Sequence, residues 1–252
     1  MSRTARLVLF AISGIGLSVA LGVAFAGLGS FGGPISTYAR LLNHLAPIQR
    51  RVTDVVSAVT FDYRGIDTLF EEFILFAAVT GLSVVLRPLS DEIRGLPEDK
   101  APDRRIPAPS PAVGLLGIVL SPLLVVIAVE TVTHGQLTPG GGFQGGVVMA
   151  SGLYVIYLAT DYTTVQRYQP TPLLEASDGM GAFGYVVIGL LGLSVGAAFM
   201  ANVVGYGHSG NLISGGTIPI LNATVGVEVA GGFSILGSEF LDQMAVVRQR
   251  RR

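Results

Sequence analysis

Apolar runs long enough to cross a lipid bilayer alternate with short polar segments along this chain. A membrane-spanning helix needs about 20 predominantly apolar residues. Four runs of about this length contain no Asp, Glu, Lys or Arg: Leu7 to Leu28, Ala112 to Val129, Phe143 to Thr160 and Gly181 to Ala201. The pattern therefore predicts four transmembrane helices, with a loop over 161–178 between the last two.

Two further apolar runs carry acidic residues. Phe73 to Leu86 is short for a span, and it reaches spanning length only if the helix starts near Ile66. Pro219 to Phe240 is long enough. These two segments contain Asp67, Glu71, Glu72, Glu228 and Glu239. We interpret both as spans whose carboxylates face protein, which predicts an all-α integral membrane protein with about six transmembrane helices.

A segment rich in proline and charge, Pro88 to Pro111, separates the first two predicted spans from the other four. Such a composition is typical of an extended connector. We therefore predict a two-helix membrane module over residues 1–87, a cytoplasmic linker over 88–111 and a four-helix membrane module over 112–252.

The distribution of basic residues predicts the orientation in the membrane. Twelve of the 16 Lys and Arg residues fall on the side that holds both termini, the linker and the 161–178 loop. The positive-inside rule places that side in the cytoplasm. The Arg-rich tail after the last span is explained by the same rule, so we expect no nucleic-acid partner. The first run also resembles a cleavable signal peptide, but its length favours an uncleaved anchor.

Composition narrows the chemistry. Only 13% of the residues are charged, against about 25% in soluble domains, and the chain has no Cys. Thiolate catalysis, disulfides and Cys-ligated iron–sulfur clusters within the chain are excluded. The three His residues are scattered, so we expect neither a metal site nor another cofactor.

The most distinctive motif is a glycine cluster after the third predicted span. It comprises Pro139, Gly140, Gly141, Gly142, Phe143, Gln144, Gly145 and Gly146. The cluster satisfies G-x-G-x-x-G, but a nucleotide-binding fingerprint also needs a preceding strand within a βαβ unit. We predict a tight hairpin in which glycines permit positive φ and close approach. Free N–H groups at the start of the next helix leave anion or lipid-headgroup binding as an alternative.

His134-Gly135 followed by this cluster resembles the signature of the MnhB domain of Mrp-type multisubunit Na⁺/H⁺ antiporters. The resemblance covers about residues 112–240. The segment from Asp62 to Glu71 resembles a motif of the MbhE-like domain, with Phe70 in place of the usual Gly. The resemblance implies a bacterial inner-membrane transporter subunit without catalytic activity of its own. It implies other Mrp subunits and lipids as partners, and Na⁺ and H⁺ as transported ions.

Carboxylates inside a membrane are the natural candidates for an ion or proton path, because a charge there normally faces protein or water. Asp67 and Glu71 share one helix face, with Glu72 adjacent, and Glu228 lies near mid-span. The alternative for the first group is a simple ion pair with Arg64. Glu130 and His134, four residues apart, form either a proton-accepting pair or a hydrogen bond that fixes the hairpin.

Three functions remain open from the sequence. The first is an antiporter subunit that scaffolds its neighbours and contributes carboxylates to the ion path. The second is a membrane subunit of a redox-driven ion pump related to membrane-bound hydrogenases and complex I. The third is a stand-alone channel or transporter.

Overall fold

The computed structural model describes residues 3–29, 33–86, 110–160 and 171–249, and throughout these ranges the regular structure is helical. The predicted all-α membrane fold is therefore confirmed. Two compact units can be distinguished, residues 1–41 and residues 42–252. The linker predicted over 88–111 lies outside the described residues except for its last two positions.

The first unit contains α1 (Arg3–Ala26) and the start of α2 (Thr37–Arg50). The apolar part of α1, Phe10–Ala26, is shorter than the five other apolar helices of the described chain. Long apolar side chains cover its surface, and Phe10 is 77% exposed. A helix with this surface is suited to lipid or to another membrane subunit.

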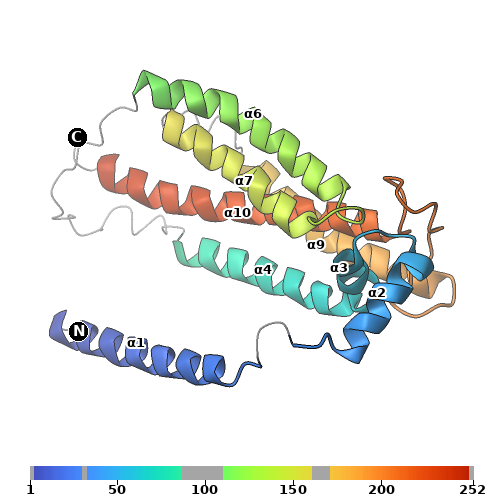
Figure 1. Ribbon diagram of the computed structural model, residues 1–252. Coiled ribbons are helices and arrows are strands. Elements are labelled where there is room, and N and C mark those ends of the chain that lie inside the picture. The colour runs from blue at the N-terminus through green and yellow to red at the C-terminus, as the bar shows by residue number, and fades with distance from the viewer. Residues whose placement is uncertain (1–2, 30–32, 87–109, 161–170, 250–252) are drawn as a thin grey trace. The chain divides into compact units, whose positions relative to one another are not determined.

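The second unit is a helical bundle. Besides the rest of α2, its described elements are α3 (Val55–Ala58), the π-helix η1 (Val59–Tyr63), α4 (Gly65–Leu86), α6 (Pro111–Thr133), α7 (Gly142–Ala159), α9 (Thr171–Ser194) and α10 (Ile218–Gln249). Among the described residues, five helices are long and apolar enough to span a membrane: α4, α6, α7, α9 and α10. The central helix, α10, packs against α4, α7 and α9, while α6 packs mainly on α7 (Figure 1).

The predicted span from Phe73 to Leu86, which is short by itself, starts earlier in the structure, since α4 begins at Gly65. The predicted loop over 161–178 is wrong for its last part, because α9 starts at Thr171 and ends at Ser194 rather than near Ala201. An apolar count misses the first two turns of α9, since they contain Glu175 and Asp178. The helix tolerates Asp178 because this side chain points into the bundle, where it is 4% exposed.

Small residues allow the helices to approach closely. A Cβ added to Gly146 on α7 would lie 2.6 Å from the Cβ of Val229 on α10. The hydroxyl of Ser121 on α6 donates a hydrogen bond to the carbonyl of Gly152 on α7, at 2.9 Å. Lipid offers no hydrophobic drive for helix association, so such contacts carry much of the packing.

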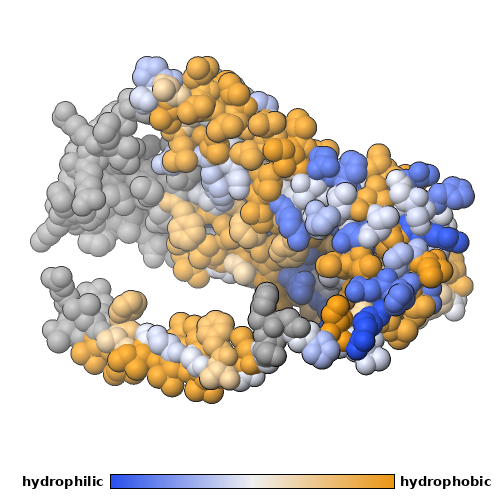
Figure 2. All heavy atoms as spheres, viewed as in Figure 1, coloured by the Kyte–Doolittle hydropathy of each residue, from blue (hydrophilic) through white to orange (hydrophobic). Residues whose placement is uncertain are grey.

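The surface of the second unit divides into an apolar and a polar region. Figure 2 shows apolar residues over α4 and α6, and polar residues at the end that holds α3 and the loop between α9 and α10. In that polar end, Arg50 Nε lies 2.6 Å from Asp62 Oδ1, and Asn202 donates to the other oxygen of Asp62 at 2.9 Å. These contacts hold the end of α2 and the loop between α9 and α10 against η1.

Candidate functional site

Two acidic side chains occupy the interior of the bundle. Glu72 on α4 and Glu228 on α10 are both 0% exposed. Their carboxyl groups lie close enough to interact with each other directly. The sequence predicted both residues as ion-path candidates, and the fold brings them together from positions far apart in the chain.

The spacing of small and polar residues explains this placement. On α4, Thr68, Glu72, Val79 and Ser83 are buried at helical spacing, so one narrow face of an otherwise apolar helix points inward. On α9, a Cβ at Gly181 would lie 2.6 Å from the backbone nitrogen of Glu228. A glycine is therefore required where α9 passes Glu228, and its absence of a side chain lets the two helices close over the carboxyl.

The buried pair lacks hydrogen-bond donors. Within the described part of the chain, none of the four carboxylate oxygens of Glu72 and Glu228 has a donor within hydrogen-bonding distance. Two ionised carboxylates repel each other in a low-dielectric interior, and neither can donate a hydrogen bond. If one group holds a proton, it can donate to the other. The arrangement therefore suits two carboxyls that share an exchangeable proton.

A third buried carboxyl lies beside this pair, and the sequence did not predict it. Asp178 on α9 interacts electrostatically with both Glu72 and Glu228, and its Oδ1 also lacks a donor. A Cβ on Gly232 of α10 would lie 3.0 Å from that oxygen. Asp178 was missed because it precedes the apolar run of α9. Its helical spacing to Gly181, one turn later, was the signal available.

The other acidic candidates on α4 lie elsewhere. Asp67, in the first turn of α4, forms an ion pair with Arg64, which directly precedes this helix, and both side chains are substantially exposed. Glu71 is exposed on the bundle surface. The structure thus separates Glu72, which faces inward, from its two acidic neighbours, which face outward.

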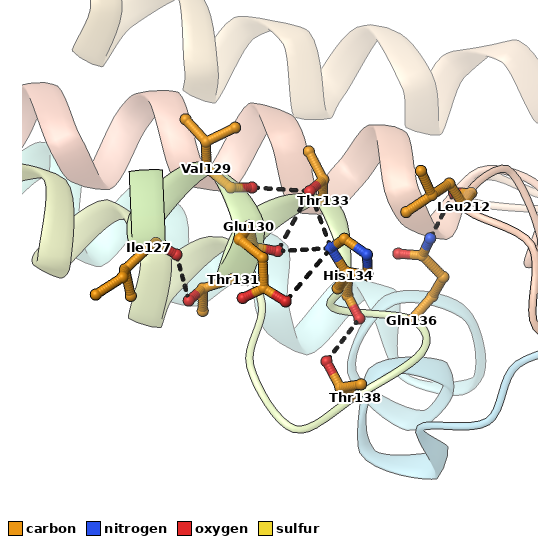
Figure 3. Close-up of polar contacts among 9 residues, drawn as sticks. All are labelled: Ile127, Val129, Glu130, Thr131, Thr133, His134, Gln136, Thr138 and Leu212. Carbon is orange, nitrogen blue, oxygen red and sulfur yellow. Dashed lines mark hydrogen bonds and ion pairs between the residues drawn. The ribbon is translucent and has the colours of Figure 1, made fainter. Parts of the chain in front are cut away.

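Glu130 and His134 lie together at the end of α6. His134 Nδ1 is 3.7 Å from Glu130 Oε1 and 3.1 Å from the backbone oxygen of the same residue (Figure 3). Glu130 is 60% exposed, so this pair lies at the surface of the chain rather than inside the bundle. The shorter contact, to the backbone carbonyl, holds the imidazole against the last turn of the helix. This geometry suits a helix-end contact better than a shielded relay.

The glycine cluster is divided between a turn and a helix. Gly140 and Gly141 have φ values of 158° and 132°, a region that favours glycine, so the turn predicted for them is present. Pro139 precedes them in the loop. Gly142, Phe143, Gly145 and Gly146 belong to the first turns of α7, where the three glycines are buried.

Asn222 of α10 fastens the start of α7. Its side-chain oxygen accepts a hydrogen bond from the N–H of Gly142 at 2.9 Å, and its amide donates to Ser57 Oγ at 3.1 Å. The first N–H groups of a helix have no intrahelical acceptor, so this side chain satisfies one of them. Because the N–H of Gly142 is buried and already donates to Asn222, it is not available to bind an anion.

No group of three or more His, Cys, Asp or Glu residues that could hold a metal ion occurs among the described residues. Glu72, Glu228 and Asp178 are thus near one another without forming such a ligand set. For the residues outside the described ranges, the expectation that the chain holds no metal stays a prediction.

Comparison with known proteins assigns a domain to the second half of the chain. Residues 113–235 match a domain described as "Domain related to MnhB subunit of Na+/H+ antiporter". An uncharacterised protein of Methanocaldococcus jannaschii is 30% identical over 197 residues, which are 73% of this chain and 75% of that protein. A Na(+)/H(+) antiporter subunit of Bacillus subtilis is 28% identical over 88 residues, 35% of this chain and 61% of that protein.

Two solved structures share the fold. One is a chain of the membrane-bound sulfane sulfur reductase, an archaeal respiratory membrane complex, with a TM-score of 0.68 and 28% identity over 95% of this chain and 99% of that chain. The other is a chain of the Mrp complex from Dietzia sp., with a TM-score of 0.71 and 24% identity over 95% of this chain and 26% of that chain. Both structures are multisubunit membrane assemblies.

Proposed function

Because this chain belongs to the MnhB family, with its domain at residues 113–235, we propose that it is a membrane subunit of an Mrp-type multisubunit cation/proton antiporter. In this role it packs against large antiporter-like subunits and small membrane subunits, and Na⁺ is the exchanged cation. Its relatives in membrane complexes support such partners. The chain is a transporter subunit rather than a catalytic one.

The buried pair of Glu72 and Glu228 is the observation that supports a direct role of this subunit in transport. A fully buried carboxyl without a donor is costly, and the cost is large at membrane depth. A purely structural helix contact would be more stable with apolar side chains at these positions. We therefore propose that this pair takes up and releases a proton during exchange.

The N-terminal part completes the proposed subunit. We assign residues 1–87 to an MbhE-like module and 112–252 to the MnhB-like module. The structural similarity to the archaeal complex extends over 95% of this chain, well beyond the matched domain, and this supports a second module. We place the protein in the bacterial inner membrane with both termini in the cytoplasm, as the positive-inside rule predicts.

Exchange in everted membrane vesicles tests the role of the pair. In Glu72→Gln and in Glu228→Gln, the initial rate of Na⁺-driven proton exchange is expected to fall at least about tenfold, with an unchanged amount of assembled complex. A tenfold effect corresponds to about 1.4 kcal/mol in the rate-limiting barrier.

The matched control is Glu71→Gln, which removes an exposed carboxyl from the adjacent position of α4. This variant is expected to retain at least about half of the exchange rate. Normal exchange by both buried-site variants across the neutral to alkaline range would refute the transport role of the pair and leave only scaffolding.

A redox-driven pump is the second candidate. It is favoured by the structural likeness to a chain of the archaeal sulfane sulfur reductase, which is matched over 99% of its length. The chain has no Cys, so any Cys-ligated iron–sulfur cluster would belong to a partner. Mass identification of the proteins that co-purify with the tagged chain separates the two functions. Antiporter-like subunits alone support the first, whereas added iron–sulfur subunits support the second.

A further inference from the structure

A pocket of about 220 Å³ lies between α4, α9 and α10. It is lined by Phe76, Val79, Thr80, Ser83, Val84, Glu175, Asp178 and Ile235. A cavity needs about 10–15 Å³ of such volume to hold one water molecule, so this pocket has room for several. Four of the lining side chains carry oxygen atoms that could bind water.

Two of these polar side chains each carry a buried oxygen atom that has no hydrogen-bond partner among the described residues. Asp178 is 4% exposed and its Oδ1 has no hydrogen bond, and Ser83 is 8% exposed and its Oγ has none. Buried polar groups are nearly always satisfied by protein or by ordered water. Since the described residues supply no partner for these two oxygens, water in the pocket is their natural partner.

The pocket lies beyond the carboxyl pair, toward one end of the bundle, and of the three carboxyls only Asp178 lines it. On α10, Gly232 beside Asp178 follows Glu228 by one helical turn, about 6 Å along the axis. On α4, the pocket residues from Phe76 to Val84 all follow Glu72. Asp178 thus stands between the pocket and the pair. The pocket lies toward the end where α4 and α10 finish and α9 begins, which the charge distribution predicts to be cytoplasmic.

We propose that this pocket is a water-filled half-channel, and that Asp178 passes protons between it and the Glu72–Glu228 pair. In the uptake direction, an O–H bond of a hydronium ion in the pocket breaks as a new O–H bond forms on Asp178. That proton then moves to one carboxylate of the pair, which restores the Asp178 carboxylate. No redox partner is needed, and the net result is transfer of one proton. The proposal deepens the proposed function, because it supplies the entry to the same pair.

The surroundings favour protons over other ligands. The titratable groups near the three carboxyls are Glu71 on α4 and Tyr185 and Glu175 on α9. Among the described residues, no Lys, Arg or His side chain lines the pocket, so they offer an anion no positive partner there. The remaining lining residues, Phe76, Val79, Val84 and Ile235, are apolar, so the oxygen-bearing side chains provide the hydrogen-bonding sites of the pocket.

Cysteine accessibility tests the half-channel independently of transport, since the native chain has no Cys. Ser83→Cys in the assembled complex is expected to react with a charged, membrane-impermeant methanethiosulfonate. Only a hydrated thiolate reacts readily, so modification reports water at the site. Labelling should be at least about tenfold faster in everted vesicles than in sealed right-side-out vesicles.

The matched control is Ser234→Cys on α10, a serine that is 2% exposed and does not line the pocket. It is expected to be labelled at least about tenfold more slowly than Ser83→Cys from either side. Equal labelling of the two positions, or no labelling of Ser83→Cys from either side, would overturn the half-channel. This result stands even if the complex proves not to be an antiporter.

The relay is tested by Asp178→Asn, with Glu239→Gln as a second buried carboxyl on α10 outside the pocket. Asp178→Asn should lower the rate of proton exchange at least about tenfold while leaving the labelling of Ser83→Cys unchanged. Glu239→Gln should retain exchange. If Asp178→Asn exchanges normally while Glu72→Gln does not, the proton reaches the pair by another route and the proposal fails, whereas the proposed function survives.

Discussion

Single polar side chains join distant segments in the polar end of the bundle. Asn222 on α10 accepts a hydrogen bond from Gly142 and donates one to Ser57, and Ser57 N–H in turn donates to Asp54 at 2.8 Å. Three helices, α3, α7 and α10, are thereby tied through one buried amide. A buried polar chain of this kind is stable only while every member keeps its partner.

Asn222→Ala is expected to lower the melting temperature of the detergent-purified complex by several degrees. The change leaves the buried N–H of Gly142 without an acceptor, which costs about 1–3 kcal/mol. Asn43→Ala, at an exposed asparagine of α2, is the control and should melt like the native protein. Equal melting temperatures for the two variants would show that the Asn222 contacts contribute little.

The partly buried carboxyl of Asp54 leads us to expect that stability depends on pH. Asp54 is the N-cap of α3, outside the spanning helices. Burial raises its pKa above the ordinary 3.8, although backbone hydrogen bonds from Ser57 and Val56 oppose the shift. Because the folded state binds this proton more readily than the unfolded state, ionised Asp54 destabilises the fold above its folded pKa, and the penalty disappears as pH falls toward 3.8.

Asp54→Asn should therefore melt at a slightly higher temperature than the native protein at pH 7, because Asn also caps helices well and carries no charge. The gain should shrink as pH is lowered toward 4. Asp54→Ala is the comparison and should be less stable at both pH values, since it loses the cap. A gain that grows on acidification would contradict the assigned sign.

At the scale of elements, glycines determine which helices can touch. Gly142 and Gly146 form one contact between α7 and α10, and Gly181 forms another between α9 and α10 at Glu228. Gly142 and Gly146 are one helical turn apart, so together they form a continuous smooth strip on α7. These close contacts hold the carboxyl pair inside the bundle.

Gly142→Val should prevent correct packing of α7 on α10, because its Cβ would lie 2.6 Å from the Cβ of Val225. We expect a large loss of assembled complex on native gels and faster proteolysis of the subunit. Gly81→Val on α4 is the control, since a Cβ there meets no atom of the chain within 4 Å. Normal yield of the Gly142 variant would mean that α7 and α10 can separate at little cost.

At the scale of the whole chain, orientation decides which side the pocket faces. The basic residues predict that the linker and both termini lie in the cytoplasm. The polar loop between α9 and α10 then lies on the opposite side. With this orientation, a proton enters the proposed half-channel from the cytoplasm.

Reactive cysteines can also report this orientation. Ser209→Cys, in the exposed loop between α9 and α10, should be labelled by a charged thiol reagent in right-side-out vesicles. A Cys appended after Arg252 should be labelled only in everted vesicles. The opposite result for both positions would show that the topology is inverted, and the half-channel would then open to the outside.

Local features of the chain were enough to specify the helical membrane character, the approximate spans, the glycine turn and the family. The length of an apolar run, the position of charges and the positive φ values that favour glycine all depend on residues that are close together in the sequence. Glu72 and Glu228 were also predicted as candidates, because any acidic residue within an apolar run is conspicuous.

The meeting of these two residues, with Asp178 beside them, emerged only from the folded bundle. Glu71 and Glu72 are adjacent in the chain, yet one is exposed and the other fully buried, because successive helical positions are 100° apart. Asp178 precedes the apolar run of α9, so no local pattern marked it as part of the interior. Its role depends on Gly232 and Gly181, which let α9 and α10 approach closely around three carboxyls from three helices.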